Sequence, residues 1–215
     1  MLVNKIVLCL MCTFVVSLHA VEADLQSGDI IFQTSGSNQS TAIMWASKSL
    51  YSHVGIIEID GNKKFVIEAI SKVSRTPLNK WIKRGRLGRY SVFRYQNLDT
   101  KKQSNIVKDA KSFLGQPYDI YFTSKNKEIY CSELVDLAFE KSGLSLGKKQ
   151  KVKELDVDNV VVRKLVEKRW YRHPVCKKVV KSFSECWKLI LEDELVTPES
   201  IAADARLLKV WSNYP

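Results

Sequence analysis

A hairpin signal in the first third of the chain is the feature that most constrains its fold. Asp60-Gly61 separates two apolar runs, residues 52–59 (SHVGIIEI) and residues 63–69 (KKFVIEA). This dipeptide favours a two-residue turn between antiparallel strands, because such turns need positive φ angles. The sequence therefore predicts two adjacent strands at these positions.

The expected turn fixes which side chains face one another across the hairpin. With Asp60 and Gly61 as the two loop residues, His53 stands directly opposite Glu68 on one face of the sheet. Side chains in such a pair have Cβ atoms about 5 Å apart. A carboxylate there accepts the proton of one imidazole nitrogen, fixes the ring tautomer and leaves the other nitrogen as a base. One additional loop residue would turn Glu68 to the other face.

Further segments extend the hairpin into an α+β domain, for which 215 residues are sufficient. Alternating or continuous apolar residues predict strands at residues 29–34 and 89–95. Helices are expected at about residues 41–48, 100–114 and 131–142. Residues 207–211 are expected to return to the core as a helical turn or a strand.

The first 23 residues have the layout of a secretory signal peptide. A positively charged start precedes the apolar run 6–18, which is too short to span a membrane comfortably. Small residues follow, so that cleavage is expected after Ala20 or Ala23. We therefore expect an exported protein, periplasmic or secreted, with a single mature domain over residues 24–215. The alternative is an uncleaved N-terminal anchor.

Export changes what the cysteines imply. Cys9 and Cys12 leave with the signal, and the mature chain keeps Cys131, Cys176 and Cys186. An oxidising compartment tends to pair thiols, and three is an odd number. Cys176 and Cys186 are near in sequence and form a candidate disulfide, provided that a turn or two helices separate them, since ten residues of continuous helix rise about 15 Å. The alternative is two buried thiols on one helix face.

Cys131 remains as the single thiol, and it stands at the start of an expected helix. Unsatisfied N–H groups and the helix dipole lower a thiol pKa there and can stabilise an oxyanion. His53 and His173 are the two histidines left after cleavage, and His53 has the carboxylate partner. We predict Cys131 as nucleophile, His53 as base and Glu68 as the acid that orients the histidine. Taken alone, each is compatible with an ordinary structural role.

The motifs resemble the NlpC/P60 cell-wall hydrolases. Three segments resemble the histidine half of that family: residues 28–32 (GDIIF), 52–57 (SHVGII) and 65–69 (FVIEA). Two others resemble the cysteine half: residues 115–118 (GQPY) and 130–135 (YCSELV). The order of the halves is reversed here, as in the circularly permuted branch, the YiiX/YebB-like papain-like amidases. The resemblance covers about residues 25–145. It implies a permuted papain-like α+β fold, in which the nucleophile helix packs on a small antiparallel sheet.

The resemblance also implies roles for individual residues. Cys131 matches the nucleophile, His53 the base and Glu68 the third polar position. Tyr118 matches a tyrosine near the oxyanion, and Ser132 is expected with it at the oxyanion and substrate-binding site.

Two departures from the family pattern concern the substrate rather than the catalytic chemistry. Glu133 stands where glycine is common, and residues 119–121 (DIY) lack the glycine pair that follows the tyrosine in wall peptidases.

Residues 148–195 lie outside the resemblance and are rich in Lys and Arg, with aromatic residues between them. We expect a mostly helical insertion that packs on the core or covers the site as a lid. Its aromatic residues Trp170, Tyr171 and Trp187 are expected either in the core or at a membrane interface.

The chain carries 34 Lys and Arg against 23 Asp and Glu, a net charge of +11. At the cell envelope such a surface attracts anionic lipid or wall polymer, although a merely soluble basic surface is an equal alternative. Export argues against nucleic acid as a partner. No metal or other cofactor is expected, because two histidines without a close ligand cluster give no zinc spacing.

Three functions follow from these observations. The first is an exported amidase or endopeptidase that cleaves cell-wall peptides (peptidoglycan) through a thioester acyl-enzyme. The second uses the same three residues on lipid esters or N-acyl amides, as a hydrolase or acyltransferase. The third is a catalytically inactive binding module, against which the intact Cys, His and Glu argue. The substrate and the oligomeric state remain open at this point.

Overall fold

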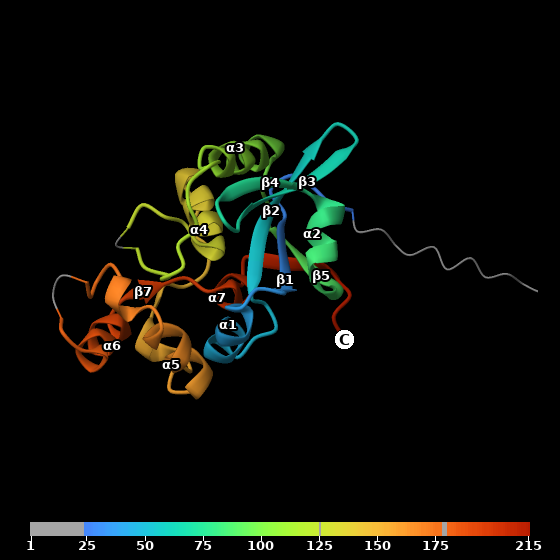
Figure 1. Ribbon diagram of the computed structural model, residues 1–215. Helices are drawn as coiled ribbons and strands as arrows, with labels where there is room; N and C mark the ends of the chain where they lie inside the picture. Colours follow the sequence, from blue (N-terminus) through green and yellow to red (C-terminus); the bar gives the residue numbers. More distant parts are fainter. Residues whose placement is uncertain (1–23, 125, 178–179) are drawn as a thin grey trace, which may run out of the picture.

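The computed structural model describes residues 24–124, 126–177 and 180–215 (Figure 1). The expected signal peptide, residues 1–23, lies outside the described residues. A six-stranded antiparallel sheet in the order β4-β3-β2-β1-β5-β8 forms the centre of the molecule. Its strands are β1 (Ile30–Ser35), β2 (His53–Asp60), β3 (Lys63–Ala69), β4 (Val73–Pro77), β5 (Gly85–Tyr95) and β8 (Leu207–Ser212).

Helices cover both faces of this sheet. Figure 1 shows α3 (Thr100–Lys111) and α4 (Cys131–Lys141) on one side and α2 (Leu78–Arg84) on the other. The α4 side contains the larger apolar core, where Phe32 and Ile56 meet Leu134 and Phe139. On the α2 side the fully buried Trp81 packs against a smaller cluster. The α+β class and the packing of the expected nucleophile helix on an antiparallel sheet are thus confirmed.

The β2–β3 hairpin forms as predicted, but its register differs. Asp60 pairs with Lys63, so the two turn residues are Gly61 and Asn62 rather than Asp60 and Gly61. Gly61 takes the first central position of the turn, where its φ of 56° suits glycine, and Asp60 remains in the strand. The predicted direct opposition of His53 and Glu68 is therefore wrong by two residues. A shift of two keeps both side chains on the same face, because side-chain direction alternates along a strand.

The other predicted elements agree with the structure to within a few residues. The helix expected at 41–48 is α1 (Ser40–Ser47), and α4 begins at Cys131, as predicted. Asp99 caps α3 by accepting a hydrogen bond from the backbone N–H of Lys102 at 2.7 Å. The C-terminal segment is a strand, β8, which pairs with β5 at the edge of the sheet. Neither β4 nor α2 was predicted.

The segment expected as an insertion, residues 148–195, is partly helical. Its elements are β6 (Gln150–Lys151), η1 (Val152–Glu154), α5 (Val160–Glu167), η2 (Trp170–Arg172), α6 (Phe183–Leu191) and β7 (Glu194–Leu195); α7 (Pro198–Ala202) follows. A second apolar cluster holds this segment against Ala42 of α1, and Trp187 is buried in it. Tyr171, by contrast, is more than half exposed.

Cys176 and Cys186 form a disulfide within this cluster, with a Cα–Cα distance of 5.3 Å. Cys186 lies in α6, which begins at Phe183, whereas Cys176 precedes the helix. The two cysteines therefore do not share a continuous helix, which is the geometric condition for such a bond. In the part of the chain that the structure describes, no helix is both long and apolar enough to cross a membrane.

Candidate active site

His53 and Glu68 are in contact on the α2 side of the sheet. His53 is the first residue of β2, Glu68 is the last but one of β3, and both are buried. The imidazole Nε2 lies 2.6 Å from Oε2 of Glu68. The imidazole ring also stacks on Trp81, with 6.0 Å between ring centroids. Carboxylate and indole together fix the orientation of the ring.

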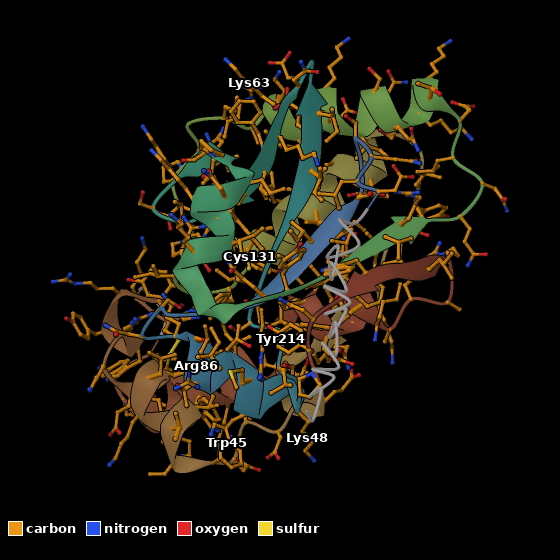
Figure 2. All side chains as sticks on the ribbon, turned by 90° about the vertical axis from the view of Figure 1, so that its right-hand side faces the viewer. Trp45, Lys48, Lys63, Arg86, Cys131 and Tyr214 are labelled. Atoms are coloured by element: carbon orange, nitrogen blue, oxygen red, sulfur yellow. A yellow bond between two sulfur atoms is a disulfide. The ribbon has the colours of Figure 1, made fainter. Side chains whose placement is uncertain are left out.

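Cys131 meets the other side of the imidazole. It is the first residue of α4, it is buried, and it is the one free cysteine among the described residues. Its thiol interacts with the imidazole of His53 and with the backbone N–H groups of Val54 and Ser132. Because Nε2 of His53 is bonded to Glu68, Nδ1 is the nitrogen that serves the thiol. Figure 2 shows Cys131 in the interior of the molecule, surrounded by side chains.

Burial disfavours charge at all three groups, and their mutual contacts outweigh it. Burial alone would lower the pKa of His53, but the hydrogen bonds with Cys131 and Glu68 raise it to about 9. Burial would likewise raise the pKa of the Cys131 thiol, yet the contact with His53 brings it below its ordinary value. Burial would also raise the pKa of Glu68, but the contacts with His53 and Arg84 lower it to about 2. These contacts favour a thiolate–imidazolium pair backed by the Glu68 carboxylate.

Arg84 is a neighbour of this site that the sequence analysis missed. Its Nη2 donates to Oε2 of Glu68, the same oxygen that contacts His53. The residue is the last of α2, a helix without a clear apolar period in the sequence. Its positive charge is the one signal in the sequence, and it shares that signal with the neighbouring basic residues of α2, Lys80 and Lys83.

Tyr118 is brought to Cys131 by backbone pairing with the turn between β3 and β4. The N–H of Tyr118 donates to the carbonyl of Ser71 at 3.1 Å, and Pro117 forms a bridge with Lys72. The phenol is partly buried and interacts with the Cys131 thiol. Burial, and then the negative charge of Cys131, hold the pKa of Tyr118 well above its ordinary value. Its hydroxyl therefore remains a hydrogen-bond donor at neutral pH.

Ser132 contributes its backbone rather than its hydroxyl. The hydroxyl donates to the carbonyl of Val196 at 2.9 Å, which ties the start of α4 to the connection between β7 and α7. Glu133, which replaces a common glycine of the resembling family, accepts a hydrogen bond from the backbone N–H of Tyr130 at 3.3 Å. Burial raises the pKa of Glu133 to about 7. This departure thus closes the first turn of the nucleophile helix.

The second departure, Asp119, stabilises the loop that carries Tyr118. Its carboxylate is fully buried and accepts hydrogen bonds from the backbone N–H groups of Tyr121 and Thr123, each at 2.7 Å. An aspartate that closes the loop on itself takes the place of the glycine pair of the wall peptidases. His173, the other candidate base, contacts the ring of Tyr121 instead, at 5.3 Å between centroids.

Two cavities of different character reach the site. On one side of Cys131 an apolar cavity of about 110 Å³ lies between the core and the segment 148–195. That segment supplies many of its apolar walls, which are Val152, Leu155, Val157, Val162, Leu165, Val166, Ile190 and Leu195. On the His53 side a more polar pocket of about 300 Å³ is lined by serines, Gln39, His53, Tyr118 and Arg84, together with the apolar residues Ile43, Ala69, Ile70 and Ile120.

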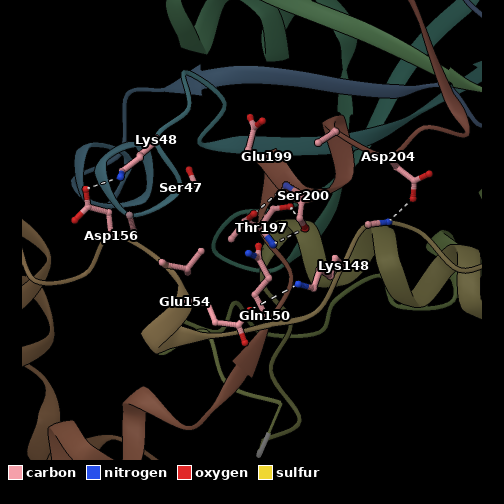
Figure 3. Close-up of a pocket in the computed structure, with 14 residues that line it drawn as sticks. Ser47, Lys48, Lys148, Gln150, Glu154, Asp156, Thr197, Glu199, Ser200 and Asp204 are labelled. Atoms are coloured by element: carbon pink, nitrogen blue, oxygen red, sulfur yellow. Dashed lines mark hydrogen bonds and ion pairs between the residues drawn. The ribbon is translucent and has the colours of Figure 1, made fainter.

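A wider groove of about 500 Å³ lies away from the three central residues (Figure 3). It is formed by the end of α1, residues 147–156 and α7. Two ion pairs border it, Lys48–Asp156 at 3.5 Å and Lys148–Glu154 at 3.8 Å. The groove adjoins the apolar cavity, because both are lined by Ala46, Ser47, Leu155 and Thr197.

Comparisons with known proteins agree with this architecture. Residues 24–211 match the model of a family described as permuted papain-like amidase enzymes, YaeF/YiiX, C92 family. The chain is 33% identical over 208 residues to the uncharacterized protein YiiX of Escherichia coli K12, covering 96% of each chain. It also resembles the crystal structure of the metalloprotein yiiX from Escherichia coli O157:H7, with a TM-score of 0.77 and 35% identity over 88% of this chain and 98% of that one.

The description as a metalloprotein applies to that relative. In this chain, the residues that the structure describes contain no group of three or more His, Cys, Asp or Glu side chains placed to hold a metal ion. The resemblance to the permuted branch, first seen in the reversed order of two motif halves, is confirmed, and the chain belongs to the YaeF/YiiX (C92) family of permuted papain-like amidases.

Proposed function

We propose that the chain is a cysteine amidase in which Cys131 is the nucleophile, His53 the general base and acid, and Glu68 the residue that orients the imidazole. The family supports papain-like hydrolase chemistry in general. The observation that carries the specific proposal is the continuous contact from Glu68 through His53 to a free thiol at the start of a helix. A buried thiol without such partners would have a raised pKa and would be inert.

The reaction follows from the polarity of this arrangement. The Cys131 thiolate attacks the carbonyl carbon of an amide, and the carbonyl oxygen becomes an oxyanion. His53 donates its proton to the leaving nitrogen as the carbon–nitrogen bond breaks, which leaves a thioester on Cys131 and an amine product. His53 then takes a proton from water, whose oxygen attacks the thioester. Release of the acid restores the thiolate–imidazolium pair.

Oxyanion stabilisation is assigned to the start of α4 and to Tyr118. Backbone N–H groups at a helix start point along the helix axis and favour negative charge. The Tyr118 hydroxyl next to the thiol adds a neutral donor that keeps its proton. We propose the backbone of Ser132 as part of this site, because its hydroxyl is already bonded to Val196.

Two substrate classes compete. Cell-wall peptides are one candidate, because the motifs resemble those of wall hydrolases. The apolar cavity beside Cys131 favours the other, a lipid ester or N-acyl amide, since its walls offer few hydrogen-bond partners to a charged wall peptide. Burying apolar substrate surface there contributes about 25 cal/mol per Å². We therefore place an amide or ester of an apolar acyl group first.

We further propose that the protein acts at the cell envelope after export. The signal-like residues 1–23 support export. The disulfide between Cys176 and Cys186 also supports it, since such bonds persist in oxidising compartments. The net charge of +11 supports attraction to anionic lipid or wall polymer. Fractionation of cells that express a C-terminally tagged full chain tests the location, and recovery in the cytosol alone would contradict it.

The decisive experiment incubates the purified protein with two substrate sets, wall fragments and labelled phospholipids together with long-chain N-acyl amides. We expect release of the acyl group from the lipid set. Release of wall peptides alone would reverse the order of the two classes. Absence of turnover on both, with bound ligand detected, would favour the inactive binding module.

Cys131→Ser is the matched control for this experiment. The change is nearly isosteric, so the thermal midpoint of unfolding should change little, whereas turnover should be lost. Retained turnover in a folded Cys131→Ser protein would contradict the assignment of the nucleophile.

A further inference from the structure

We propose that the polar pocket beside His53 binds an anionic group of the substrate, a carboxylate or a phosphate, through the guanidinium of Arg84. This inference rests on the proposed function, because it places the anionic group on a molecule whose amide or ester is attacked by Cys131. The apolar cavity lies on the other side of the thiol. The substrate would then be amphipathic, apolar at one end and negatively charged at the other.

The lining of the pocket has the composition of an anion site. Beside the apolar side chains of Ile43, Ala69, Ile70 and Ile120 it contains hydroxyl, amide, phenol, imidazole and guanidinium groups, and among the described residues that line it there is no carboxylate. Arg84 is the one permanently charged side chain of this lining. An anion that enters the pocket therefore meets hydrogen-bond donors and a cation, while the carboxylate of Glu68 is buried and bonded to Arg84.

Arg84 retains capacity for a second partner. Its side chain is 39% exposed, and the contact recorded for its guanidinium in the described structure is the one from Nη2 to Glu68. A guanidinium has five N–H donors in a planar fork, of which this contact uses one. Carboxylates and phosphates match the fork with two parallel hydrogen bonds. The contact with Glu68 fixes the guanidinium at Nη2, and the other N–H donors are available to a ligand in the pocket.

Gln39 is the second donor that the pocket can offer. This residue precedes α1 and lines the pocket, and its Oε1 is buried without a hydrogen-bond partner in the described part of the chain. The oxygen and nitrogen of an amide exchange places by a simple flip, so the group can present its NH₂ to an anion. An unpaired buried amide is costly, and a ligand that pairs with it would recover that cost.

A purely structural role for Arg84, neutralising Glu68, is the competing explanation. It predicts that loss of Arg84 alters the reactivity of Cys131 equally toward all reagents. Anion binding predicts in addition a change that depends on the charge of the reagent. The two explanations are separated by reagents of equal reactivity and different charge that modify the thiol directly.

The test measures how fast Cys131 reacts with three methanethiosulfonates that carry a carboxyethyl, a propyl or a trimethylammonioethyl group. In each reaction the thiolate displaces methanesulfinate and forms a mixed disulfide, so no hydrolytic turnover is needed. Peptide mass spectrometry identifies the modified cysteine. The wild-type protein should react with the anionic reagent at least about tenfold faster than with the neutral one, relative to the same ratio for a free thiol.

Arg84→Gln should abolish most of this preference, and Arg84→Lys should keep part of it. The rate with the neutral reagent corrects for any change in the His53–Glu68 pair. Arg86→Gln is the matched control, because Arg86 is exposed and does not line the pocket. An unchanged preference in Arg84→Gln, or no preference in the wild type, would overturn the proposal.

A second measurement uses the unmutated protein and is independent of whether Arg84→Gln folds. Acetate or inorganic phosphate, at matched ionic strength, should slow modification by the propyl reagent with saturation, and chloride should not. The more effective of the two anions identifies the carboxylate or the phosphate class. Protection by neither would contradict anion binding. Absence of amide turnover with protection intact would contradict the proposed function instead and leave the anion site standing.

Discussion

Gly55 lies against Glu68 in the β2–β3 hairpin, and a Cβ at position 55 would stand 3.3 Å from the Cβ of Glu68. The same Cβ would be 2.5 Å from Cγ1 of Val66 and 2.8 Å from the carbonyl oxygen of Ile67. Contacts this short do not occur, so any side chain here must push β3 away from β2. The missing side chain therefore allows the close approach in which the carboxylate of Glu68 reaches His53.

We expect Gly55→Ala to lower both stability and turnover. Crowding of a packed core costs about 1–3 kcal/mol, and the backbone of Ile67 can yield only by moving the strand that carries Glu68. Urea unfolding measures the first effect and acyl release the second. Gly36→Ala is the control, because its added Cβ would lie 3.7 Å from the nearest atom, the carbonyl oxygen of Arg84. Equal behaviour of the two variants would contradict the steric argument.

Glu68→Gln tests the orientation of the histidine. The amide keeps the shape of the carboxylate but can donate as well as accept, so it no longer fixes one tautomer of His53 or stabilises the imidazolium. We expect turnover to fall by about tenfold or more. The pKa of His53 should fall as well, which NMR titration of the imidazole measures. Full activity in this variant would assign the orienting role to another group.

The pH dependence of the reaction follows from the same contacts. Activity requires an ionised Cys131 and a protonated His53. Because the pKa of the thiol is lowered and that of His53 is raised to about 9, kcat/KM should form a broad bell. Its alkaline limb should fall near pH 9, when the imidazolium loses its proton. An alkaline limb near pH 6.5, the ordinary value for histidine, would contradict the coupling.

Glu68 and His53 both contribute to the stability of the fold, but one contribution is lost at acid pH and the other at alkaline pH. Glu68 has a folded pKa of about 2, below its ordinary value, so its contribution is present above about pH 4.5 and is lost as the pH falls toward 2. His53 has a raised folded pKa, so its contribution is complete below about pH 6.5 and is lost as the pH rises through 9. Unfolding curves across both windows should show the two losses, and Glu68→Gln should remove the acid one.

The sequence predicted which face of the sheet carries His53 and Glu68 correctly, but it misplaced the two residues along their strands. The period of two residues along a strand assigns His53 and Glu68 to one face in either register, so an error of two residues left the contact intact. The register itself depends on which residue of the turn takes the positive φ. In the structure Gly61 takes the positive φ at the first central position, and Asp60 stays in β2.

Arg84 and the apolar cavity show what the sequence could not provide. Arg84 is the last residue of α2, which follows β4; neither of these short elements has a clear period of two or of 3.6 residues, and the partner of Arg84, Glu68, is 16 positions away. The cavity arises from apolar residues of α1, α5 and the segments on either side of α5 and α6, which meet the start of α4 only when the chain is folded. Each of those residues has the pattern of ordinary core packing, and its part in a cavity depends on tertiary structure.

The disulfide between Cys176 and Cys186 gives a prediction for the segment that forms the apolar cavity. The bond closes a loop of about ten residues, and in the chain-entropy treatment such a loop stabilises the native state by about 2–3 kcal/mol. Since α6 contributes Ile190 to the cavity and Cys186 lies in the same helix, loosening of α6 should affect substrate binding more than thiol chemistry. Cys176→Ser with Cys186→Ser should therefore lower stability and raise KM for the apolar substrate, with the rate of Cys131 modification by the neutral reagent nearly unchanged.

Mass spectrometry of unreduced, alkylated protein tests the bond itself. Of Cys131, Cys176 and Cys186, only Cys131 should be alkylated after unfolding. Alkylation of all three would refute the bond, and an unchanged KM in the double variant would separate the bond from the cavity.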